Sequence, residues 1–114
     1  MIQIYHNSRC GKSRNCVAFI EESKYEYEII NYLTNPPTME ELSIMIEKLK
    51  IKPIDLVRQK EKIWVKNFRD LNLNEQQIVQ TMVENPILIE RPIVILGDKA
   101  IIGRDLENVS AFLP

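Results

Sequence analysis

Cys10 lies in a short segment rich in basic residues, and it is the best candidate in the chain for a reactive group. Arg9, Lys12 and Arg14 are its near neighbours, and their charge has the same sign as the positive end of a helix that begins there. An unperturbed thiol is only about 3% ionised at pH 7, so lowering its pKa by ~2 units would leave it mostly thiolate. The sequence therefore predicts a nucleophile at Cys10. A Cys that only packs in the core is the alternative, but such residues seldom stand in loops flanked by Gly and Arg.

Three better-known sites are excluded by spacing. Gly11-Lys12-Ser13 resembles the end of a nucleotide-binding P-loop, but His6 stands where that loop needs its first Gly. A tyrosine-phosphatase loop would place an Arg at position 16, which is Cys16. A thioredoxin-type pair would place its second Cys at position 13, which is Ser.

Two further residues near Cys10 have more than one interpretation. Cys16 lies about 240° around the expected helix from Cys10, on its apolar stripe, which favours core packing over a role as a resolving thiol. His6 could assist the thiolate as an imidazolium, or it could simply hydrogen-bond the loop. The residues alone leave both alternatives open for His6.

Composition narrows the class of protein. The chain has 114 residues, with 15 Lys and Arg against 16 Asp and Glu, and this predicts one ordinary globular domain over residues 1–114. A formal charge of -1 argues against a nucleic-acid partner that needs a broad basic face. One His and two Cys cannot supply a four-ligand zinc site, and two Cys are too few for a secreted fold that depends on disulfides. The longest aliphatic run, residues 93–96, is too short for a membrane span, and we expect a cytoplasmic protein.

The elements that must position Cys10 can be read from apolar periodicity. Residues 2–5 and 25–30 alternate as strands, and residues from Ser13 onward have helical spacing, which makes a β-α-β unit with parallel strands. Chemistry in such units lies at the carboxyl end of a strand, near His6.

The middle of the chain is expected to be helical. Thr38 with Glu41, and Asn74 with Gln77, are capping boxes that start two helices, the second ending at Asn85-Pro86. Residues 54–73 indicate short helical turns. The expected buried anchors of these turns are Leu56, Val57, Trp64, Phe68 and Leu71.

The last third returns to strands. Residues 93–96 and 99–102 flank Gly97-Asp98, whose leading Gly suits a type II′ hairpin turn. Asp105 can cap a final helix. The apolar side of that helix would comprise Leu106, Val109, Phe112 and Leu113. The order of elements predicts a small mixed sheet with helices on both faces.

Several motifs together resemble one family. His6, Cys10 and Arg14 fit the spacing His-x3-Cys-x3-Arg, and the chain resembles the glutaredoxin-coupled arsenate reductases over nearly its whole length. The likeness continues in the segments 32–38, 56–60, 85–94 and 102–104. This resemblance implies an α/β, thioredoxin-like fold: a four-stranded mixed sheet with flanking helices and a helical insertion between the second and third strands.

The resemblance also implies a site. Cys10 would be the nucleophile, with His6 and Arg14 as further catalytic residues. The residues expected to bind the oxyanion are Arg58, Arg91 and Arg104. Guanidinium forks suit tetrahedral oxyanions and stabilise the charge that builds as a thiolate attacks. The Arg91–Pro92 bond is expected to be cis, as in this fold.

The implied activity is reduction of arsenate, or a related small oxyanion, to arsenite. Glutathione would be the co-substrate and glutaredoxin the partner, with no bound cofactor or metal, in a monomer that binds neither nucleic acid nor membrane. A glutathione-dependent thiol-disulfide reductase of the same superfamily is one alternative. An RNA-polymerase-binding regulator without enzymatic activity is another, although Ser13 replaces the second Cys of the redox switch that such proteins often carry.

Overall fold

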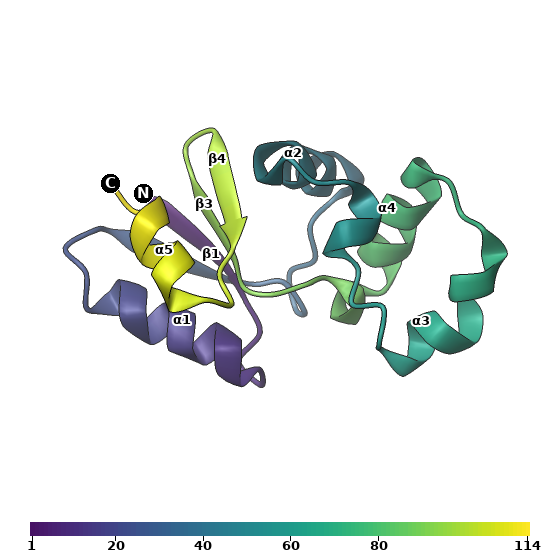
Figure 1. The fold of residues 1–114 in the computed structure, drawn as a ribbon, viewed down its shortest axis with the longest axis horizontal. Coiled ribbons are helices and arrows are strands. Elements are labelled where there is room, and N and C mark those ends of the chain that lie inside the picture. Colours follow the sequence, from purple (N-terminus) through teal and green to yellow (C-terminus); the bar gives the residue numbers. More distant parts are fainter. The chain divides into compact units, whose positions relative to one another are not determined.

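A four-stranded sheet forms the centre of the first of two structural units (Figure 1). The computed structural model describes residues 1–114, and it divides into residues 1–35 with 91–114, and residues 36–90. The sheet order is β2-β1-β3-β4. The strands are β1 (Ile2–His6), β2 (Tyr27–Asn31), β3 (Ile93–Leu96) and β4 (Lys99–Ile102). β1 pairs with β2 in parallel and with β3 antiparallel, which confirms the expected mixed sheet.

Two helices pack in the core of this unit, α1 (Gly11–Glu21) and α5 (Leu106–Phe112). The shared core comprises Ile2, Ile4, Cys16, Ile20, Val94 and Val109. α1 begins two residues before the predicted start, because Cys10 rather than a later residue serves as its N-cap. Cys16 is fully buried in this core, in agreement with the core-packing interpretation.

The connections of the sheet follow local chemistry. Gly97 has φ 62° while Asp98 does not have a positive φ, as a type II′ turn requires, so the predicted hairpin is confirmed. β2 begins at Tyr27, two residues later than expected, because the Tyr25 N–H donates to Ser23 Oγ in a turn at the end of α1. The Tyr25 hydroxyl also donates to the Pro114 carbonyl.

The second unit is the helical insertion between β2 and β3. It contains α2 (Met39–Leu49), η1 (Pro53–Leu56), α3 (Lys62–Asn67), η2 (Arg69–Leu71), α4 (Glu75–Glu84) and η3 (Pro86–Leu88). Both predicted capping boxes are confirmed: Glu41 N donates to Thr38 Oγ1 at 3.1 Å, and Gln77 N donates to Asn74 Oδ1 at 2.8 Å. No helix of either unit combines the length and the apolar character needed to cross a bilayer.

The predicted anchors of residues 54–73 are only partly correct. Leu56, Val57 and Trp64 are buried, and the half-buried Phe68 has its ring 6.0 Å from that of Trp64. Leu71 is 61% exposed, so that prediction is wrong. It ends a single turn of 3-10 helix and precedes Asn72, whose left-handed φ of 54° turns the chain, and one turn is too short to maintain an apolar stripe.

The prediction for the last helix is also wrong at one residue. Leu106 is 38% exposed, whereas Val109 is fully buried and Phe112 and Leu113 are half-buried. Leu106 is the first residue of α5 and lies at its frayed end, where the apolar stripe begins.

Gly103 is the tightest point of the first core. A Cβ at this position would lie 2.9 Å from Cys16 Sγ, 3.1 Å from Val94 Cγ2 and 3.3 Å from Val109 Cγ2. We expect Gly103→Ala to lower the free energy of unfolding by about 1–3 kcal/mol through overpacking. Denaturant unfolding measures this, with Gly11→Ala as the control, since a Cβ there meets only Arg14 at 3.7 Å. Equal stability of the two variants would contradict the prediction.

Candidate active site

Cys10 occupies the junction between β1 and α1. Its N–H donates to the Asn7 carbonyl at 3.0 Å, and its own carbonyl accepts the Arg14 N–H at 3.0 Å. It is thus the N-cap of α1, with extended backbone angles. The half-buried sulfur is therefore available at the positive end of the helix.

Ser13 holds the loop before Cys10 in place. Its fully buried Oγ accepts the Asn7 N–H at 3.1 Å and lies 2.6 Å from His6 Nδ1. Its backbone N–H donates to the Cys10 sulfur. The buried Asn7 in turn accepts the Arg9 N–H at 2.9 Å. One residue thus connects the end of β1, the loop and the thiol.

Sequence reasoning missed both Ser13 and Asn7 as site residues. A signal for each was present in the loop. A Ser three positions after a candidate N-cap can present its backbone N–H to that cap, and an Asn two positions before a basic residue favours an Asx turn.

Two arginines reach the thiol from the other end of the chain. Arg104 Nη1 lies 3.7 Å from Cys10 Sγ and donates to the Arg91 carbonyl at 2.8 Å. The buried Arg91 guanidinium also hydrogen-bonds the sulfur. The Arg91–Pro92 peptide bond between β3 and the preceding segment is cis. Residues separated by 94 positions in the chain therefore meet at one sulfur atom.

These contacts set the charge of Cys10. Burial by itself would raise the pKa of the thiol, but the Ser13 N–H and the guanidiniums of Arg91 and Arg104 lower it from 9.0 to about 7. A substantial fraction of the residue is therefore thiolate at neutral pH. Burial in an apolar core raises the pKa of Cys16 to about 11, so that residue remains a thiol. The two cysteines of the chain have opposite chemistry.

His6 and Arg14 lie on the loop side of the site. Burial, and then the charge of Arg14, lower the pKa of His6, so its ring is mostly neutral at pH 7. This favours the second of the two interpretations, in which His6 hydrogen-bonds the loop through Ser13. The exposed Arg14 donates to the Ser8 carbonyl at 3.1 Å, which ties its guanidinium to the backbone of the loop.

Arg58 lies in the second unit. Its guanidinium pairs with Glu61 at 3.1 Å and with Glu90 at 3.5 Å, and its N–H donates to the Leu88 carbonyl at 2.7 Å. The Glu90 N–H donates to the Leu56 carbonyl at 2.8 Å. Two carboxylates and a backbone bridge therefore hold this arginine in one orientation.

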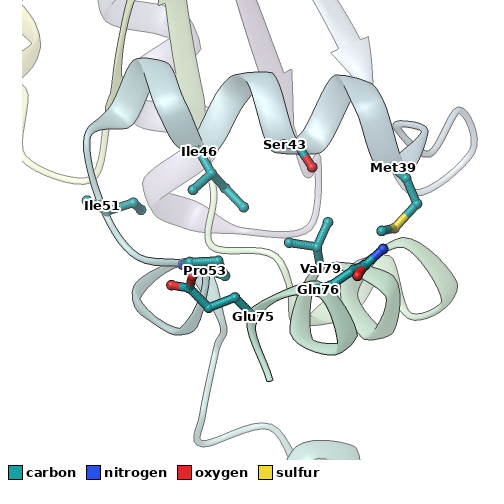
Figure 2. A pocket seen from close by; sticks show the side chains of 8 residues that line it. All are labelled: Met39, Ser43, Ile46, Ile51, Pro53, Glu75, Gln76 and Val79. Carbon is teal, nitrogen blue, oxygen red and sulfur yellow. The ribbon is translucent and has the colours of Figure 1, made fainter. Parts of the chain in front are cut away.

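A groove in the second unit is lined by other residues than these. It has a volume of about 410 Å³ and lies between α2, α4 and η1 (Figure 2). Figure 2 shows Met39 and Ile46 of α2 pointing toward Val79 of α4 across it. None of the predicted site residues lines this groove.

Comparisons with known proteins match the whole chain. A family model described as the ArsC family matches residues 5–112. An Escherichia coli K12 protein, the uncharacterized YfgD, is 40% identical over 110 residues, covering 95% of this chain and 92% of its own. An arsenate reductase of Neisseria meningitidis serogroup A is 35% identical over 114 residues, with 98% and 97% covered. The solved structure of an arsenate reductase from Vibrio cholerae superposes with a TM-score of 0.92 at 35% identity, covering 98% of this chain and 97% of its own.

The pKa of Cys10 makes its reactivity depend on pH. We expect alkylation of the folded protein by iodoacetamide to modify Cys10 alone, with a half-maximal rate at about pH 7. Arg104→Gln should move this midpoint to higher pH, because the thiolate loses a cationic donor. Arg69→Gln is the control, since the exposed Arg69 pairs only with Asp70 in the second unit. Modification of Cys16 in the folded protein, or equal midpoints for the two variants, would refute the assignment.

Proposed function

Because the chain belongs to the ArsC family, we propose that it is an oxidoreductase that reduces arsenate to arsenite through the Cys10 thiolate. The observation that carries this proposal is the pair Arg91 and Arg104 at a thiol with a pKa of about 7. Relatives named arsenate reductase, at 35% to 38% identity over nearly the whole chain, support the substrate.

The first step is a substitution at arsenic. The Cys10 sulfur donates an electron pair to As(V), an S–As bond forms, and one arsenate oxygen leaves as water after taking up two protons. Negative charge on the remaining oxygens is largest as the thiolate attacks. Arg91 and Arg104 are the cations beside the sulfur that can stabilise this charge. The oxidation state of arsenic does not change in this step.

The second step is the reduction. A thiolate of glutathione attacks the Cys10 sulfur, the S–As bond breaks, and its electron pair stays on arsenic, which leaves as As(III). Cys10 is then joined to glutathione in a mixed disulfide. A glutaredoxin thiol attacks the glutathione sulfur and releases Cys10 as thiolate for the next cycle.

The state of Cys16 supports the proposal of an external thiol donor. That residue is fully buried, and burial raises its pKa to about 11, so it cannot supply the second thiolate. The chain has no third cysteine. Glutathione with glutaredoxin is the proposed donor, and the cycle uses no bound cofactor.

Arg58 is the third proposed ligand of the oxyanion. Its pairs with Glu61 and Glu90 fix the guanidinium while leaving part of its donor fork for an anion. Arg14 and His6 have supporting roles in this proposal. Arg14 fixes the loop through the Ser8 carbonyl, and the neutral His6 fixes Ser13, whose N–H donates to the sulfur.

Turnover tests the nucleophile. The protein is mixed with arsenate, glutathione, glutaredoxin and an NADPH-coupled glutathione reductase, and NADPH oxidation is followed. We expect Cys10→Ser to abolish arsenate-dependent turnover, whereas Cys16→Ala should retain it in folded protein. Arg104→Gln should lower kcat/KM by about a hundred-fold, the typical cost of one lost donor to a developing oxyanion. Full activity of Cys10→Ser would end the proposal.

Oxyanion binding separates this function from plain thiol-disulfide reduction, which needs no anion pocket. We expect arsenate to slow the alkylation of Cys10. Sulfate should do the same, because it is also a tetrahedral anion but is not reduced by thiols. The protection should be lost in Arg91→Gln and Arg104→Gln and kept in Arg69→Gln. Turnover of glutathione mixed disulfides without any protection by oxyanions would favour the thiol-disulfide reductase instead.

A further inference from the structure

The loop that carries Cys10 holds two cations that the mechanism does not use. Arg9 and Lys12 are both exposed. Neither residue takes part in the ion pairs that Arg58 and Arg69 form. Neither the Arg9 nor the Lys12 side chain has a hydrogen bond, so both charges face solvent.

These cations flank the thiol on both sides along the chain. Arg9 directly precedes Cys10, and Lys12 is the second residue of α1, whose N-cap is Cys10. Arg9 is the immediate neighbour of Cys10 and Lys12 is two positions away, so both belong to the exposed loop and first helical turn that carry the sulfur. Glu21 is the first acidic residue of the sequence, and no carboxylate of this segment offsets them.

Arg9 and Lys12 are not the groups that lower the pKa of Cys10. That effect comes from the Ser13 N–H, Arg91 and Arg104. Arg91 is buried and Arg104 is half-buried, whereas Arg9 and Lys12 are exposed to solvent. A second reactant that reaches the half-buried sulfur from solvent meets the loop and first helical turn that carry these two exposed cations.

We propose that Arg9 and Lys12 form a docking surface that selects a carboxylate-bearing, negatively charged thiol or disulfide as the reaction partner of Cys10. Two unpaired cations in the segment that carries a half-buried nucleophile attract an anionic reactant and raise its rate of encounter. Glutathione, with two carboxylates and one ammonium, has this chemistry. The inference rests on the proposed function, in which a thiol reacts with Cys10 after arsenate. Disulfide exchange at Cys10, however, can be measured without arsenate.

Disulfide exchange at Cys10 tests the surface directly. The Cys10 thiolate attacks one sulfur of a probe, a mixed disulfide forms, and the other sulfur leaves as a thiolate. The probes are dithiobis(nitrobenzoate), a dianion, dithiodipyridine, which is neutral, and cystamine, which is cationic. The neutral probe reports the intrinsic reactivity of the thiolate, so any change confined to the charged probes is electrostatic.

We expect Arg9→Gln and Lys12→Gln each to slow the dianionic probe by about two- to five-fold at low salt, the range of exposed charge pairs. The rate with the neutral probe should stay unchanged, and cystamine should react faster. High salt should remove the differences. Lys99→Gln is the matched control, because it removes an exposed cation of the same unit at the far end of β4.

Equal slowing of all three probes, or an equal effect of Lys99→Gln, would overturn the docking surface. In the arsenate assay, the two loop variants should raise the KM for glutathione with kcat unchanged. The two proposals fail separately. Charge selectivity without arsenate turnover removes the arsenate proposal alone, and Cys10-dependent turnover without charge selectivity removes the docking surface alone.

Discussion

The negative charge on a half-buried sulfur is the constraint on which the rest of the site depends. Burial opposes ionisation of Cys10, and three donors reverse that effect: the Ser13 N–H and the guanidiniums of Arg91 and Arg104. The strand register brings them together. Tyr5 pairs with Ile93, so the end of β1 lies beside the start of β3, which directly follows Arg91-Pro92.

The strand register also positions Arg104. Ile93 pairs with Ile102 in β4, so the chain leaves the sheet next to the start of β3 and Arg104 follows two residues later. A central strand with a parallel neighbour on one side and an antiparallel neighbour on the other thus assembles a thiol and two cations at one edge. Net charge does not reveal this. A chain with a formal charge of -1 concentrates cations around one atom, which suits a small anion although the chain as a whole is near neutrality.

Local signals in the sequence predict local structure well here. The capping boxes at Thr38 and Asn74 are complete within four residues, and the Gly97 turn within two, so each is independent of the rest of the fold. Burial at the ends of short elements depends on distant neighbours, and the prediction for Leu71 therefore failed. For the same reason the burial of Ser13 was not predicted, because only tertiary packing determines that a Ser in a first helical turn is fully buried.

The residues of the site also differ in whether local signals or distant contacts position them. Flanking charges and an expected helix start were enough to predict Cys10 as the reactive residue. The convergence of Arg91 and Arg104 depends on strand pairing, which spacing in the sequence does not encode. Their assignment came from the family resemblance, and the role of Arg58 in the second unit remains a prediction of that resemblance.

Cys10 and Cys16 show how the environment, rather than the residue type, determines the chemistry. Six positions apart, one has its pKa lowered to about 7 by donors and the other has its pKa raised to about 11 by burial. Gly103 connects the two environments. Its lack of a side chain lets the end of β4 pack against Cys16 Sγ, and its N–H donates to the Pro92 carbonyl at 2.8 Å. Because Arg104 is the next residue, the close packing that keeps Cys16 a protonated core thiol also sets the position of a guanidinium that ionises Cys10. The stability of the core and the reactivity of the site are therefore coupled through one backbone position.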